Sequence, residues 1–111
     1  MLGLAHLADR PAADVTPSQQ RLLEIGMALG TRPRLLLLDE VAAGLTESEV
    51  DAMAQRIRRL RDDWGLTVVW IEHAVTTLLK YVERVLVLHQ GRKIADGTPA
   101  EVVRDPQVIE A

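Results

Sequence analysis

Four leucines at residues 35–38 run directly into two adjacent acids, Asp39 and Glu40. A continuous apolar run of this length, bounded by Pro33 and by the two acids, predicts a strand that is buried on both faces of a parallel sheet. In open α/β sheets, ligands collect at the carboxyl ends of such strands, so the two acids stand where chemistry would take place. Acids at a strand end also serve as turn formers and helix caps, and the strand alone leaves that alternative open.

Two more apolar runs predict further strands. Residues 66–71 are β-branched and apolar on both faces, which again indicates a buried strand. Residues 84–89 predict a third strand, and Gln90 with Gly91 predicts a tight turn into a fourth. The last two strands are therefore expected to form a β-hairpin.

Capping signals mark the starts of three helices. Thr16 and Gln19 form a capping box, as do Thr46 and Glu49, and Thr98 begins a third helix. The second helix is predicted to bury a stripe of residues at helical spacing, namely Val50, Met53, Ala54, Ile57 and Leu60.

Shorter segments connect these elements. Residues 1–8 read as the tail of a helix, residues 12–15 as a loop and residues 75–81 as a short helix, with one more helical turn from Pro106. The order strand, helix, strand, helix, strand, strand, helix predicts an α/β fold: a mostly parallel sheet flanked by helices, with a C-terminal β-hairpin.

Composition narrows the class of protein. A length of 111 residues fits one small domain or part of a larger one. The formal charge of −3 gives no basic surface for nucleic acid. No apolar run is long enough to span a bilayer, and the first residues lack the layout of a signal peptide. The absence of cysteine excludes disulfide and thiolate-metal sites and is compatible with the cytosol.

Polar side chains follow two consecutive predicted strands, with Asp39 and Glu40 after one and His73 after the next. If the strands are neighbours, these groups meet at one sheet edge. Asp39 could hold Mg²⁺ directly or through water, because this cation prefers carboxylate oxygens. Glu40 could orient or deprotonate an attacking water, and His73 could hydrogen-bond a phosphate oxygen. A lone histidine after a strand is more often a surface residue, and the pairing with the acids favours the functional alternative.

The order of these motifs resembles the ATP-binding cassette ATPases of ABC transporters. Residues 15–20 stand where that family has its Leu-Ser-Gly-Gly-Gln signature, and residues 35–40 resemble the Walker B strand with the catalytic glutamate. Residues 43–46 match the D-loop region and His73 the switch histidine. Two stretches, residues 23–45 and 91–111, look most like the nucleotide-binding subunits of branched-chain amino acid importers.

The resemblance implies a partial P-loop NTPase fold without its P-loop strand. It divides the chain into the end of a helical subdomain with a degenerate signature at 1–33, a core α/β region at 34–97 and a helical tail at 98–111. It assigns Glu40 and His73 to catalysis and Asp39 to Mg²⁺. The remaining implied contacts to nucleotide come from the signature, in trans, and from the D-loop: Thr16, Ser18, Gln19, Gly44 and Leu45.

The resemblance also implies cofactors and partners. The full-length family member would hydrolyse ATP with Mg²⁺ to drive import of branched-chain or related amino acids. It would pair with a second ATP-binding subunit, as a homodimer or heterodimer, and with transmembrane permease subunits. It would lie in the cytoplasm, peripheral on the inner face of the plasma membrane, and would bind no nucleic acid.

The chain also departs from the family pattern. Its 111 residues contain no G-x-x-x-x-G-K-[ST] motif and no Q-loop. Pro17 and Ser18 replace signature glycines, Val41 replaces the usual proline after the Walker B glutamate, and Thr46 replaces the D-loop acid. In the family, the P-loop strand lies between the strands of residues 66–71 and 84–89, and its absence leaves their edges unpaired. We therefore expect the 111-residue chain by itself to be marginally stable and not to hydrolyse ATP.

Two other functions fit parts of the pattern. The C-terminal half of an SMC-like or DNA-repair ATPase would also pair a signature with Walker B, but the first fifteen residues show no coiled-coil heptads. A noncatalytic α/β interaction module that lost its P-loop would explain the degenerate signature. A Walker A motif encoded in frame before Met1 would favour the ATPase, and nucleotide binding would separate it from the module.

Overall fold

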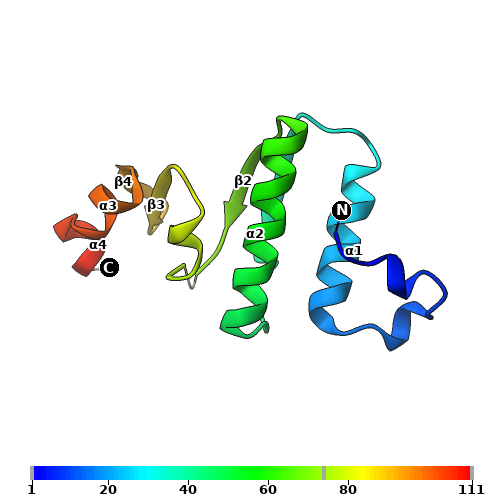
Figure 1. Ribbon diagram of the computed structural model, residues 1–111. Coiled ribbons are helices and arrows are strands. Elements are labelled where there is room, and N and C mark those ends of the chain that lie inside the picture. Colours follow the sequence, from blue (N-terminus) through cyan, green and yellow to red (C-terminus); the bar gives the residue numbers. More distant parts are fainter. Residues whose placement is uncertain (1, 74, 111) are drawn as a thin grey trace. The chain divides into compact units, whose positions relative to one another are not determined.

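The computed structural model describes residues 2–73 and 75–110, and the chain divides into two compact units, Met1–Val75 and Thr76–Ala111. The first unit contains η1 (Ala5–Leu7), η2 (Ala12–Asp14), α1 (Pro17–Leu29), β1 (Leu35–Asp39), α2 (Glu47–Trp64) and β2 (Thr67–Ile71) (Figure 1). The second unit contains η3 (Leu78–Lys80), β3 (Val85–His89), β4 (Arg92–Gly97), α3 (Pro99–Val103) and α4 (Pro106–Glu110). The α/β class is confirmed, whereas the subdomain division at residues 33 and 97 stays a prediction.

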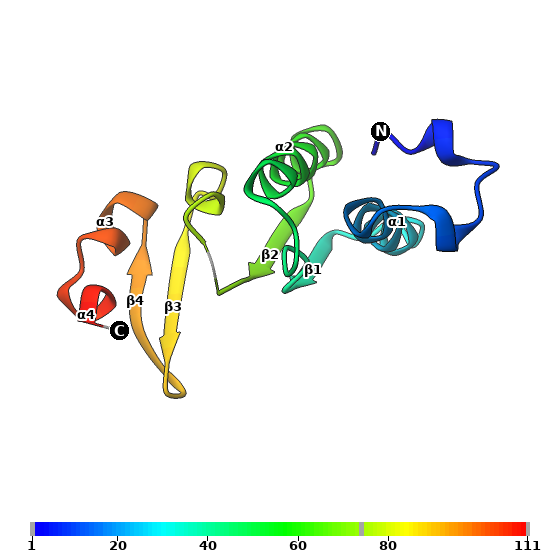
Figure 2. The same cartoon turned by 90° about the horizontal axis from the view of Figure 1, so that it is seen from below.

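The first unit is built on a parallel pair of strands. Leu35 of β1 lies opposite Thr67 of β2, and the register continues to Asp39 opposite Ile71. Helix α2 provides the crossover between the two strands, and both α1 and α2 lie on the same side of the pair (Figure 2). This is the strand–helix–strand unit that the sequence predicts, and it brings the carboxyl ends of both strands to one edge.

The two long helices begin as their capping signals predict. The Thr16 hydroxyl accepts a hydrogen bond from the Gln19 N–H, and the Gln19 side chain accepts one from the Thr16 N–H. Thr46 and Glu49 form the same reciprocal pair at the start of α2. Gly65 ends α2 in the left-handed region, with φ of 65°, which glycine adopts without a steric penalty.

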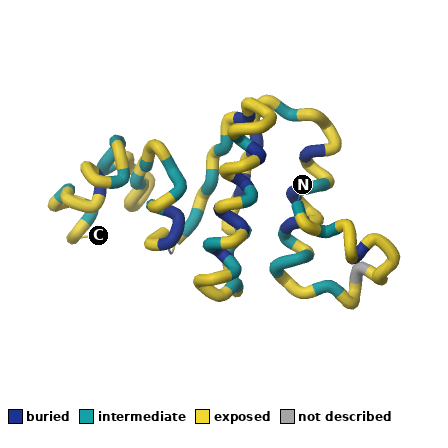
Figure 3. Tube along the Cα trace, in the orientation of Figure 1, coloured by how far each residue is buried: buried dark blue, intermediate teal, exposed yellow. Residues whose placement is uncertain are grey.

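The core of the first unit lies between the helices and one face of the strand pair. All five residues of the predicted α2 stripe are buried, and Leu60 is only 1% exposed. Figure 3 shows the buried positions of α2 recurring along the helix. The cluster joins α1, β1, α2 and the residue before β2 through Leu22, Ile25, Leu29, Leu36, Leu38, Met53, Ile57, Leu60 and Leu66.

The opposite face of the strand pair is open, so the prediction that these strands are buried on both faces is wrong. The side chains that point to this face are between 47% and 68% exposed: Leu35, Leu37, Val69 and Ile71. Burial of a strand depends on what packs against each face. Within the described residues of this unit, α1 and α2 cover one face and no element covers the other.

The second unit is a β-hairpin followed by two short helices. Gln90 and Gly91, with φ of 50° and 76°, form the tight turn that the sequence predicts between β3 and β4. Arg84 donates two hydrogen bonds to Asp96 across the hairpin, at 2.7 and 2.6 Å, and this guanidinium lowers the pKa of the Asp96 carboxyl. Thr98 caps α3 by accepting the Glu101 N–H.

Within the described residues, β2 pairs only with β1 and β3 pairs only with β4. Each of these two strands therefore keeps one edge without a partner, as expected for this fold without its P-loop strand. No helix in the described ranges has the length and apolar character that crossing a bilayer requires.

The short connecting segments differ most from their predictions. Residue 1 is not described, and the helix tail predicted for residues 1–8 is a single 3-10 turn, η1. The loop predicted for residues 12–15 contains another such turn, η2, and the helix predicted over residues 75–81 is only η3. Neither η1 nor η3 has a side-chain cap, and segments this short do not sustain an α-helix without one.

Candidate functional site

The carboxyl ends of β1 and β2 meet at one edge, where three of the predicted site residues lie. Asp39 is the last residue of β1 and lies opposite Ile71, the last residue of β2. The Glu40 N–H donates to the Ile71 carbonyl at 2.8 Å, which extends the pairing by one residue. The acids after one strand and the histidine after the other are thereby brought together.

Glu40 and His73 are in direct contact. The Glu40 Oε1 and the His73 Nε2 are 2.5 Å apart. The His73 side chain is 84% exposed and the Glu40 side chain 46% exposed, so a ligand has access to both groups. Pairs this exposed contribute little to folding stability. The contact therefore adds little to the free energy of folding, and its interest lies in the chemistry that the two groups could perform.

The backbone of Glu40 is unusual. Its φ is 53°, in the left-handed region that side chains with a Cβ rarely adopt. Two hydrogen bonds hold it there: its N–H donates to Ile71, and its carbonyl accepts the Ala43 N–H at 3.2 Å. Such conformations cost about 1–3 kcal/mol and cluster at functional sites, which makes Glu40 the strongest candidate at this edge.

Asp39 provides one exposed carboxylate beside this pair. No group of three or more potential metal ligands occurs among the described residues. A single carboxylate does not make an all-protein cage, but it suits Mg²⁺, which keeps several waters and takes its other ligands from substrate phosphates. The residues present therefore fit a magnesium ion that binds together with a phosphorylated ligand.

The loop after Glu40 carries the D-loop residues. Gly44 has φ of 78°, which only glycine adopts readily, and the Leu45 N–H donates to the Ala42 carbonyl at 3.1 Å. Leu45 packs against the core cluster. Arg21 of α1 donates to the Ala43 carbonyl at 3.4 Å, so the loop is attached to α1 as well as to the strands.

Glu72 is a residue of this site that the sequence analysis missed. Its Oε1 accepts hydrogen bonds from the Ala42 N–H at 2.8 Å and from the Trp70 Nε1–H at 2.9 Å. The available signal was an acid at a strand end, directly before His73.

The signature residues are engaged at the start of α1. The capping box engages the backbone N–H groups of Thr16 and Gln19 as donors, so neither N–H is free for a phosphate. Pro17 has no N–H, which leaves the N–H of Ser18 as the nearest backbone donor. The pKa of Glu49 is lowered, first by hydrogen bonds from the Thr46 N–H and hydroxyl and to a smaller extent by the Ser18 side chain. No hydrogen bond among the described residues joins this region to Glu40 or His73.

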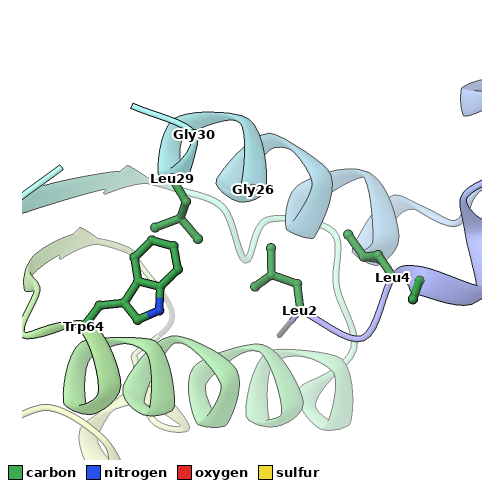
Figure 4. A pocket seen from close by; sticks show the side chains of 7 residues that line it. Leu2, Leu4, Gly26, Leu29, Gly30 and Trp64 are labelled. Carbon is green, nitrogen blue, oxygen red and sulfur yellow. The ribbon is translucent and has the colours of Figure 1, made fainter. Parts of the chain in front are cut away.

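An open apolar cavity of about 410 Å³ lies elsewhere in the first unit, between the N-terminal segment, α1 and the end of α2 (Figure 4). Its lining is made of Leu2, Leu4, Ala5, Gly26, Leu29, Gly30 and Trp64. No residue in this lining has a titratable side chain, so the cavity has no groups for hydrolytic or phosphate chemistry.

Comparison with known proteins shows which proteins this chain is similar to. The model of the branched-chain amino acid ATP-binding cassette transporter family matches residues 92–111. The chain is 40% identical over 110 residues to the high-affinity branched-chain amino acid transport ATP-binding protein BraF of Pseudomonas aeruginosa, covering 99% of this chain and 43% of that protein. It is 36% identical to LivG of Escherichia coli K12, with the same coverage.

A solved structure agrees with these relatives. The ADP conformation of an ATP-binding cassette of an ABC transporter matches 98% of this chain and 44% of its own length, with a TM-score of 0.91 and 34% identity. The chain thus spans less than half the length of the proteins it matches. It corresponds to the C-terminal part of the branched-chain amino acid ATP-binding proteins, an ATP-binding cassette ATPase portion.

Proposed function

We propose that the β1–β2 edge is the part of an ATP site that holds the attacking water. The observation that carries this proposal is the 2.5 Å contact between Glu40 and His73 at the carboxyl ends of two parallel strands. Both groups are open to a ligand, and the backbone of Glu40 is held in a left-handed conformation of the kind that clusters at functional sites. ATP is the ligand that the relatives support, since BraF and LivG are named as ATP-binding proteins.

Each residue at the edge has a distinct role in this proposal. Glu40 orients the attacking water and accepts its proton. His73 hydrogen-bonds a γ-phosphate oxygen and holds the Glu40 side chain in place. Asp39 would hold Mg²⁺ directly or through water, and the ion would supply positive charge to the phosphates. Gly44 and Leu45 shape the D-loop beside them.

The phosphate cradle of this site is not among the 111 residues, since they contain no P-loop motif. In the proposal, the chain supplies Asp39, Glu40 and His73 to one ATP, while Thr16, Ser18 and Gln19 face the ATP of a second subunit. The occupied cap of α1 makes the second contribution the weaker of the two.

The names of the relatives support a class of transported substrate. BraF and LivG are named for high-affinity branched-chain amino acid transport, and they match this chain at 40% and 36% identity. We infer that the polypeptide containing this sequence powers uptake of branched-chain or related amino acids. Its partners are then a second ATP-binding subunit and transmembrane permease subunits, at the cytoplasmic face of the membrane.

The test is the rate of ATP hydrolysis by the intact natural polypeptide that carries this sequence, compared with its Glu40→Gln variant. Removing a general base lowers turnover by about 10²- to 10⁴-fold. Because Gln keeps the shape and the hydrogen-bonding capacity of Glu, the Kd for ATP is expected to stay within about threefold of wild type.

The matched control is Glu24→Gln, which changes an exposed acid of α1 in the same way. It should leave both turnover and ATP binding unchanged. Turnover by Glu40→Gln equal to that of wild type would contradict the proposal.

A second function is favoured by one observation, the capped and glycine-free start of α1. A noncatalytic ABC-like interaction module would need no signature donors. Equilibrium binding of ATP and Mg²⁺ by the intact polypeptide separates the two functions, because the module would bind neither.

A further inference from the structure

We propose that Glu72 is a positioning residue, which ties the loop after β1 to the end of β2 and so holds Glu40 against His73. This role rests on the function proposed above, but its physical basis can be measured separately. Glu72 has no role in the motifs that define the site, and its importance becomes visible only in the folded chain.

One oxygen atom of Glu72 makes both contacts. Its Oε1 accepts the Ala42 N–H at 2.8 Å and the Trp70 Nε1–H at 2.9 Å. Both bonds have a carboxylate acceptor and are partly buried, so they are stronger than ordinary neutral hydrogen bonds at a surface. The first bond joins positions 30 residues apart in the sequence.

The Trp70 indole fixes the direction of the Glu72 side chain. Trp70 packs against the hydrophobic core, so its N–H has a defined position. A carboxylate held by that N–H has lost much of its rotational freedom before it meets the loop. Glu72 can therefore act as a rigid support for Ala42 at little further cost in conformational entropy.

The loop needs such a support because it starts from an unfavourable conformation. Glu40 has φ of 53°, and the chain turns there toward Ala42. Another side-chain hydrogen bond to this loop runs from Arg21 to the Ala43 carbonyl and is longer, at 3.4 Å. Of these two attachments, Glu72 provides the shorter and the one nearer to Glu40 in sequence.

The same residue also controls the partner of Glu40. His73 follows Glu72 directly, so fixing Glu72 at the strand end limits where the imidazole can lie. Through its side chain Glu72 holds the loop that begins at Glu40, and through its backbone it holds His73. Loss of this tether should loosen the Glu40–His73 contact without removing either group.

The experiment uses two variants of the intact natural polypeptide, Glu72→Met and Glu72→Gln. Met has a similar length but cannot accept the two N–H bonds, whereas the amide oxygen of Gln can accept both. In Glu72→Met, hydrogen exchange of the amides of residues 41–45 should accelerate by about 10-fold or more, and the kcat for ATP should fall by about 10-fold, with KM within about twofold. Glu72→Gln should restore both quantities to near wild-type values.

Glu24→Met and Glu24→Gln serve as controls, since Glu24 is exposed on α1. Unchanged exchange of residues 41–45 in Glu72→Met would overturn the tether itself. Faster exchange with unchanged kcat would overturn the positioning role, as would failure of Glu72→Gln to restore kcat. If the wild type hydrolyses no ATP although residues 41–45 are protected, the proposed function fails and the positioning role fails with it, while the tether stands.

Discussion

The proposal places two regions of the chain against ATP, and the structure shows their polar groups in different states. At the carboxyl edge of β1 and β2, Glu40 and His73 are in contact and open to a ligand. At the start of α1, Thr16 and Gln19 satisfy each other in a capping box. The edge keeps its functional groups available to a ligand. The signature region uses its own backbone N–H groups to cap α1. The comparison shows that a helix cap and a phosphate site compete for the same backbone N–H donors.

The first prediction compares a substitution at the β1–β2 edge with one at the start of α1. His73→Ala should lower ATP hydrolysis by the intact polypeptide by about 100-fold, because it removes a group that stabilises the transferring phosphate and holds Glu40. Thr16→Ala should change the rate by less than about threefold, because the Thr16 hydroxyl acts as a helix cap. Its loss lowers the free energy of unfolding by about 1 kcal/mol. Steady-state rates of both variants, measured side by side, provide the test. Equal losses in the two variants would show that the regions do not differ.

The second prediction restores what the signature region lacks. The double change Pro17→Gly and Ser18→Gly gives α1 a backbone N–H that proline cannot provide and permits closer approach of a phosphate. Turnover should rise by about 10-fold, the value of one hydrogen bond to a charged group.

Pro99→Gly is the matched control, because Pro99 occupies the same first position in α3. It should leave turnover unchanged. A double variant no faster than wild type would mean that the degenerate signature does not limit the rate.

The third prediction has the smallest effect. It compares how the caps of α1 and α2 make the free energy of unfolding depend on pH. Thr46 hydrogen bonds lower the pKa of Glu49 below its ordinary value of 4.5, whereas Gln19 does not titrate at the equivalent position of α1. A lowered folded-state pKa stabilises the fold above the unfolded value, and this contribution disappears as pH falls through the folded value. Urea unfolding of the intact polypeptide should therefore lose less stability between pH 7 and pH 3 in Glu49→Gln than in wild type. Identical losses would contradict this assignment.

Local signals predicted the helices well. The caps at Thr16, Thr46 and Thr98 involve residues three positions apart, and the structure confirms all three. The buried stripe of α2 is also confirmed, because helical periodicity fixes which positions share a face. The Gln90–Gly91 turn is likewise a local property of two residues.

Features that depend on distant partners were harder to predict. Leu35 and Leu37 are as apolar as Leu36 and Leu38, yet only the second pair is buried, because burial depends on what packs on each face. The Glu40–His73 contact was expected on the condition that the two strands are neighbours, which the parallel pairing satisfies.

Glu72 was missed for a similar reason. Its two hydrogen bonds join a loop and a strand end that meet only through the crossover of α2. No periodicity or capping rule refers to such a pair. The roles of the site residues in catalysis likewise stay predictions until they are measured.

The central claim is that the β1–β2 edge holds the attacking water of an ATP site. The phosphate-binding loop of that site lies outside these 111 residues. The most direct test is ATP turnover by the purified 111-residue chain, with and without Glu40→Gln. The account predicts no turnover above background in either case, because no P-loop motif is present to bind the phosphates. Turnover by the 111-residue chain that disappears in Glu40→Gln would contradict it.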